Sequence, residues 1–181
     1  MKSSLSVFIA IFWMAWVTGF EALPSWATDS VIEESIRTIR HRCAEVDRDL
    51  KRCQQIKRDL VGYSTEGGEL TTYLLNSSVR KMVAQLYGER GQSTQEYYFW
   101  DDQLFFVFQI ESRYDKPLSG RVVERAEARF YFSDGALIRW LAGMKQIPAS
   151  SSEAKQRGRE LLDRATEFSN LAKGTQSGGQ K

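Results

Sequence analysis

Apolar residues from Val31 to Leu60 recur every three or four positions, which is the spacing of one face of an α-helix. Ser30 and Glu33 have the spacing of a capping box, a common start of a helix. No glycine or proline interrupts residues 31–60. The pattern therefore predicts one long helix over residues 31–60. Its apolar stripe consists of Ile32, Ile36, Ile39, Cys43, Val46, Leu50 and Cys53.

The two cysteines of the chain, Cys43 and Cys53, both lie on this stripe. Ten residues of helix span about 15 Å, whereas a disulfide requires Cα atoms within about 7 Å of one another. A straight helix therefore cannot hold the bridge. Three alternatives remain: the thiols are buried as small apolar groups, the helix breaks near residues 47–49 to form a hairpin, or the stripe faces its copy in a second chain.

Beyond Glu69 the apolar residues recur with a period of two, which is typical of β-strands. Six segments follow this pattern: 70–75, 79–87, 94–100, 103–111, 122–133 and 136–141. A second helix is expected after Pro148, because Ser150 and Glu153 again have capping-box spacing. Its apolar face is thin, and Gly158 weakens it by about 1 kcal/mol relative to alanine. Residues 174–181 are predicted to form a disordered tail.

Three of the gaps between strands have the composition of two-residue hairpin turns: Asn76-Ser77, Asp101-Asp102 and Asp134-Gly135. The residues around them share one form, in which a tyrosine and a large apolar residue precede the turn and an aliphatic residue follows it. The sequence therefore predicts one hairpin design that is used three times in an antiparallel meander.

Pairing each hairpin directly about its turn assigns the strand residues to two faces. One face is strongly apolar and is expected to receive the long helix. It consists of Tyr97, Phe99, Leu104, Phe106, Phe108, Ala128, Phe130, Phe132, Leu137 and Leu141. The other face is amphipathic and also holds Val107. Its remaining members are the candidate binding residues Tyr98, Trp100, Phe105, Arg129, Tyr131, Ile138 and Trp140.

This amphipathic face allows two interpretations. Either the C-terminal helix covers it, since large apolar patches are rare on monomers, or it binds a partner or ligand, since Tyr, Trp and Arg are favoured at interfaces. The thin apolar face of the C-terminal helix and its Gly158 predict a poor cover. The sequence favours cover by the C-terminal helix, and this weakness of the helix keeps the binding surface as the alternative.

The N-terminal segment has the layout of a secretory signal peptide: Lys2, an apolar run over residues 5–20, and small residues at Ser25 and Ala27. The alternative is an uncleaved anchor, but a run of about 16 residues is short for a membrane span of about 20. Cleavage after Ala27 predicts a periplasmic or secreted protein with a single domain over residues 28–173. No later segment is long and apolar enough to span a membrane.

Charge and composition narrow the chemistry. A net charge of +2 argues against a dedicated nucleic-acid-binding protein. His41 is the only histidine, so a site with several histidine ligands cannot form in one chain. We find no nucleophile motif, phosphate-binding loop or cofactor signature. The turn residues Asn76, Asp101, Asp102 and Asp134 are a weak candidate for a calcium or carboxylate site, because turns use these residue types anyway.

Together these patterns predict an α+β fold: a long N-terminal helix packed on a twisted antiparallel β-meander of about six strands, with a shorter C-terminal helix. The leading functional hypothesis is an exported, non-catalytic binding or accessory protein whose aromatic face holds an unknown protein or small ligand. The alternative is a structural envelope subunit that forms a homo-oligomer through the helix at 31–60. An enzyme is the third possibility.

Overall fold

The computed structural model describes residues 25–174, which form a mixed fold of helices and one antiparallel sheet. Helix α1 (Ser25–Asp49) and the short 3₁₀ helix η1 (Leu50–Arg52) come first, and helix α2 (Ser152–Ala172) comes last. The eight strands are β1 (Gln54–Asp59), β2 (Gly68–Leu75), β3 (Ser78–Gly88), β4 (Gly91–Trp100), β5 (Gln103–Tyr114), β6 (Val122–Ser133), β7 (Ala136–Ala142) and β8 (Lys145–Ile147). Each strand pairs with its neighbour in the chain.

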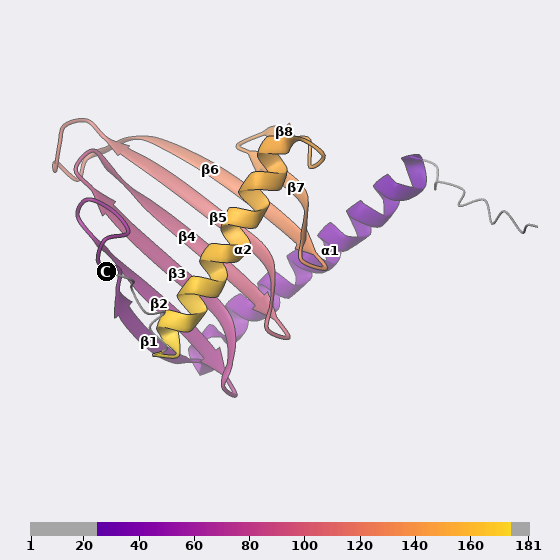
Figure 1. Cartoon of the computed structure of the whole chain (residues 1–181), viewed down its shortest axis with the longest axis horizontal. Helices are drawn as coiled ribbons and strands as arrows, with labels where there is room; N and C mark the ends of the chain where they lie inside the picture. Colours follow the sequence, from indigo (N-terminus) through magenta and orange to yellow (C-terminus); the bar gives the residue numbers. More distant parts are fainter. Residues whose placement is uncertain (1–24, 175–181) are drawn as a thin grey trace, which may run out of the picture.

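The sheet lies between the two helices, with α2 on the near face and α1 on the far face in Figure 1. Beneath α1, Ile36, Ile39 and Val46 pack in one apolar core. Their partners from the sheet include Tyr98, Phe105 and Tyr131. Beneath α2, Leu161, Ala165 and Phe168 pack in a second core. The sheet residues of that core include Leu70, Met82, Tyr97, Phe99, Val107, Phe130 and Phe132.

The predicted helix over residues 31–60 is wrong at both ends. Helix α1 begins at Ser25, so Ser30 lies inside it, and it ends at Asp49. Residues 54–59 instead form β1, which pairs with β2. This segment, QQIKRD, has Ile56 as its one apolar residue and carries no alternating pattern, so its strand conformation depends on the neighbouring β2. The helix ends at Asp49, which agrees with the alternative of a break near residues 47–49. However, Cys43 and Cys53 form no disulfide and are both free.

All six predicted strands are present, and the sheet has eight strands because β1 and the three-residue β8 were missed. The predicted hairpin design is confirmed as well. Both residues of each turn have positive φ, namely Asn76 and Ser77, Asp101 and Asp102, and Asp134 and Gly135. That conformation defines the type I′ turn, which asparagine, aspartate and glycine tolerate best.

Each of the three hairpins also carries a β-bulge at the same place beside its turn, which the sequence did not predict. The register shifts between Tyr73 and Leu74, between Tyr98 and Phe99, and between Tyr131 and Phe132. The extra residue on the second strand is Arg80, Phe105 or Ile138. One extra residue moves every side chain beyond it to the other face of the sheet.

The predicted assignment of faces is therefore wrong in two respects. Phe106, Phe108 and Leu141 lie on the face that α1 covers, whereas Val107 and Trp140 lie on the α2 face. The long helix packs on the tyrosine-rich face rather than on the face of Tyr97 and Phe99. Helix α2 covers that second, strongly apolar face.

Gly158 allows α2 to approach the sheet closely, rather than marking it as a poor cover. It is buried, and a Cβ atom at this position would lie 3.0 Å from Cβ of Leu137 on β7. The N-cap of α2 is Ser151, whose hydroxyl accepts a hydrogen bond of 3.1 Å from the backbone N–H of Ala154. The predicted cap, Ser150, is one residue too early.

Gly158→Ala should destabilise the protein, although alanine favours a helix by about 1 kcal/mol. The Leu137 Cβ is attached directly to the backbone and cannot rotate away, so α2 must shift, and overpacking of this kind costs about 1–3 kcal/mol. We expect a net loss on the order of 1 kcal/mol in urea unfolding. Lys155→Ala, on the exposed side of α2, serves as the control. A Gly158→Ala variant more stable than the parent would contradict this packing.

Candidate functional site

The structure brings together six of the seven candidate binding residues. Tyr98, Trp100, Phe105, Arg129, Tyr131 and Ile138 lie on the α1 face. Trp140 lies on the opposite face, where its ring centroid is 5.3 Å from that of Phe130. The cover of the aromatic face is therefore α1, not the C-terminal helix that the sequence suggested.

Helix α1 buries the centre of the aromatic face. Tyr98 and Phe105 are 5% exposed and Tyr131 is 3% exposed, so these rings form core rather than open surface. Phe106 links them, with ring centroids 5.6 Å from Tyr98 and 5.0 Å from Tyr131. Aromatic pairs at such distances stabilise beyond the area that they bury. What remains open of this face lies along the two edges of α1.

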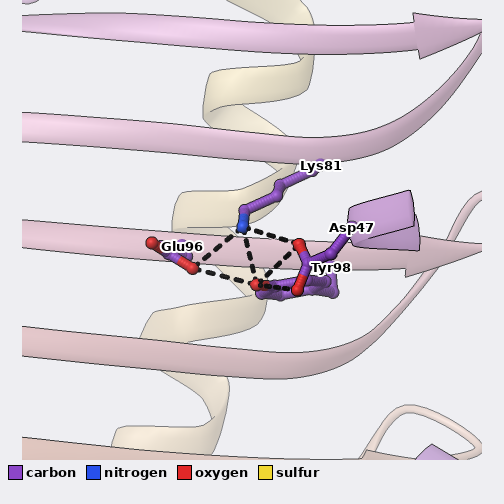
Figure 2. Close-up of polar contacts among 4 residues, drawn as sticks. All are labelled: Asp47, Lys81, Glu96 and Tyr98. Carbon is purple, nitrogen blue, oxygen red and sulfur yellow. Dashed lines mark hydrogen bonds and ion pairs between the residues drawn. The ribbon is translucent and has the colours of Figure 1, made fainter. Parts of the chain in front are cut away.

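A buried lysine ties α1 to the sheet (Figure 2). The Lys81 ammonium on β3 is 3.0 Å from Asp47 Oδ1 on α1 and 3.0 Å from Glu96 Oε2 on β4. It also donates a hydrogen bond of 2.6 Å to the Tyr98 hydroxyl. The pairing of β3 with β4 produces this arrangement, because it places Lys81 directly opposite Tyr98. We call Asp47, Lys81, Glu96 and Tyr98 the lysine clasp.

The lysine clasp has the chemistry of a structural connection. Burial, together with the negative charges of Glu96 and Asp47, raises the pKa of Tyr98 far above its ordinary value. The phenol therefore keeps its proton and can donate it to Glu96 Oε2, 2.9 Å away. The sequence carries no local signal for this network, because its members come from three elements that only the fold brings together.

One edge of α1 borders a groove of about 430 Å³, which we call the α1 groove. Helix α1 contributes Ile39, Arg40 and Cys43 to it. The strands β5, β6 and β7 contribute Phe106, Arg129, Tyr131 and Leu141. Five of the seven lining side chains are apolar or aromatic, and the other two are arginines. An apolar cavity with a few placed polar groups is the usual form of a small-molecule site.

Cys43 lines this groove as a thiol. Burial raises its pKa to about 12, with a further contribution from the negative charge of Asp47. The pKa of Cys53, at the end of η1, is raised too, again mainly by burial. A thiol with a raised pKa is a poor nucleophile at neutral pH, because the thiolate is the reactive form. Cys43 is therefore a poor candidate for a catalytic nucleophile.

Two further grooves contain acidic residues. The groove along the other edge of α1, of about 340 Å³, includes Trp100 and Phe105 with Arg42, Glu34 and Asp134. A groove of about 500 Å³ between α2 and the hairpin turns is lined partly by Asp102, Asp134 and Lys173. Two of the four turn residues considered above thus share a groove. Within residues 25–174, no group of three or more His, Cys, Asp or Glu side chains is placed to hold a metal ion.

No protein-family model matches the chain, and no curated protein or solved structure matches it significantly. Neither helix in the described part of the chain is long and apolar enough to cross a membrane. The predicted signal peptide and disordered tail lie almost entirely in residues 1–24 and 175–181, outside the described residues.

Lys81→Met should destabilise the protein by about 2–3 kcal/mol, because it leaves two carboxylates facing each other without their cation. This is below the value of about 3–5 kcal/mol for a fully buried pair, since Asp47 is half exposed. Lys57→Met is the control: its pair with Glu69 also has an N···O distance near 3 Å but is exposed, so stability should hardly change. Equal losses in urea unfolding of the two variants at neutral pH would contradict the clasp.

Cys43 should react with iodoacetamide roughly a thousandfold more slowly in the folded chain than in urea, as its pKa of about 12 replaces the ordinary value of 9.0. The folded state therefore favours the protonated thiol of Cys43. The contribution of this thiol to the free energy of unfolding is complete below pH 9 and is lost as the pH rises toward 12. A Cys53→Ser chain isolates the reaction. Similar labelling rates for folded and unfolded chains would show that Cys43 is not buried as described.

Proposed function

We propose that the protein is an exported, non-catalytic binding protein that holds a small apolar ligand in the α1 groove. The observation that carries the proposal is the concave arrangement beneath an edge of α1, in which the partly exposed Phe106 and Leu141 lie beside the buried ring of Tyr131. Its volume of about 430 Å³ lies within the usual range of about 300–1,000 Å³ for small-molecule sites. The expectation of export rests on residues 1–27 of the sequence.

The walls of the groove are held in place before any ligand arrives. Phe106 and Tyr131 belong to paired strands in the interior of the sheet and lie directly opposite one another. On the other side, Ile39 is 4% exposed, and the lysine clasp fixes the following turns of α1. A preformed site avoids the free-energy cost of ordering side chains when the ligand binds.

The lining of the groove supports binding rather than catalysis. It contains no carboxylate and no histidine, so it offers no general base. The Cys43 thiol has a raised pKa and is a weak nucleophile. These properties make a non-catalytic role the best account of the site.

The structural-subunit alternative is not favoured by a specific observation. It requires the apolar stripe of the long helix to meet a second chain. In the structure, Ile36, Ile39 and Val46 from that stripe are buried against the sheet of the same chain.

The test is a titration of the full chain with Nile red, a neutral dye whose emission rises in apolar sites. We expect saturable binding that weakens about tenfold in Leu141→Asn, since a polar group then lies unpaired in the groove. Val122→Asn is the matched control. Val122 is exposed at the start of β6, where it pairs with Tyr114, whereas the groove residue Tyr131 lies near the other end of that strand. Absent or non-saturable binding would overturn the function, and equal binding by both variants would overturn the site.

A further inference from the structure

We infer that the ligand of the α1 groove is a single-chain anionic amphiphile, with one hydrocarbon chain and a carboxylate, sulfate or phosphate head group. This inference rests on the proposed function and adds the chemical class of the ligand. The charge and shape of the groove both support it.

The lining of the α1 groove carries positive charge and no negative charge. Arg40 on α1 and Arg129 on β6 both line it, and its other five residues include no carboxylate. The two other grooves described above each combine a cation with two carboxylates. The α1 groove is thus complementary to an anion.

The guanidinium group of Arg40 has no hydrogen-bond or ion-pair partner among the described residues. It is exposed on α1. Its charge helps to lower the pKa of Glu33, but the main cause is the hydrogen bond that Arg139 Nη2 donates to Glu33 Oε1 at 2.6 Å. Glu33 is therefore already engaged, and Arg40 remains available to a ligand.

Arg129 is held in position but is not fully neutralised. Its Nη2 is 2.8 Å from Glu127 Oε2, and its guanidinium carbon lies 5.2 Å from the centroid of the Phe108 ring. Arg125 also pairs with Glu127, at 3.4 Å, so two arginines share one carboxylate. The local charge stays positive. A guanidinium held by such contacts is preorganised to bind an oxyanion through its remaining N–H groups.

The apolar part of the groove defines the rest of the ligand. Phe106, Tyr131, Leu141 and Ile39 offer hydrocarbon contacts, and the aliphatic stems of the arginines extend the apolar surface toward the rim. About 430 Å³ is near the small end of the range for ligand sites, which suits one hydrocarbon chain rather than the two of a phospholipid. The arrangement thus fits a chain lying against the rings with its head group near the two arginines.

The experiment is isothermal titration of the full chain with four probes of equal chain length, each kept below its critical micelle concentration or, for the neutral probe, below its solubility in water. Decanoate and decyl sulfate are the anions, decanol is neutral and decyltrimethylammonium is a cation. We expect both anions to bind about tenfold or more tightly than decanol, and the cation to bind most weakly. Decanol binding as tightly as decanoate would overturn the anionic class while leaving the proposed function intact. Failure of all four probes to bind would overturn both.

Matched variants locate the head group. Arg40→Gln and Arg129→Gln should each weaken decanoate binding about tenfold and leave decanol binding unchanged. The controls are Arg37→Gln on α1, whose side chain pairs with Glu34, and Arg113→Gln on β5, whose side chain pairs with Glu124. Equal effects of the groove variants and the controls would show a nonspecific charge effect and overturn the assigned site.

Cys43 reports on occupancy by the chain of the ligand. In a Cys53→Ser chain, saturating decanoate should slow the iodoacetamide labelling of Cys43, because Cys43 lines the groove. In a Cys43→Ser chain, the labelling of Cys53 should not change, because Cys53 lies outside it. Unchanged labelling of Cys43 at saturation would place the ligand elsewhere and overturn the inference.

Discussion

Side chains alternate between the two faces of a strand, so a single extra residue beside a turn decides which helix every later side chain meets. In this protein one extra residue occurs at the same place beside each of the turns Asn76-Ser77, Asp101-Asp102 and Asp134-Gly135. As a result Phe105 and Phe106 both lie on the α1 face, where direct pairing would put them on opposite faces. The aromatic density of residues 97–108 is thus divided between two cores, and the ring of Phe106 lies at the edge of α1 where the groove forms.

The same bulges position the polar contacts that hold α1 in place. Arg80 and Lys81 share the α1 face because of the first bulge, which lets the Lys81 ammonium reach Asp47 and Glu96. The third bulge places Ile138 and Arg139 on that face, and Arg139 then binds Glu33 in the first half of α1. The helix is therefore held by ion pairs at Glu33 and Asp47 and by apolar contacts between them. A fixed helix gives the groove beside it a fixed shape, which lowers the free-energy cost of ordering the site when a ligand binds.

The sequence predicted what local chemistry determines. Asn76-Ser77, Asp101-Asp102 and Asp134-Gly135 identified the turns because few residue types tolerate positive φ, and alternation identified the six regular strands. The sequence did not predict features that depend on a neighbouring strand. Strand β1 has one apolar residue and is a strand because β2 lies beside it, and the bulges follow from pairing rather than from composition. Six of the seven candidate site residues still share a face. Trp140 is the only one of the seven that follows a bulge along its strand, and the bulge at Ile138 moves it to the other face.

The central claim is that α1 and the strands beneath it enclose a preformed site for an anionic amphiphile. Amide hydrogen exchange of the full chain, followed by mass spectrometry with and without decanoate, tests it most directly. The account predicts slower exchange in α1 and in strands β5–β7, with no change in α2 on the opposite face of the sheet. Protection confined to α2, or no protection at a decanoate concentration that saturates binding, would contradict it.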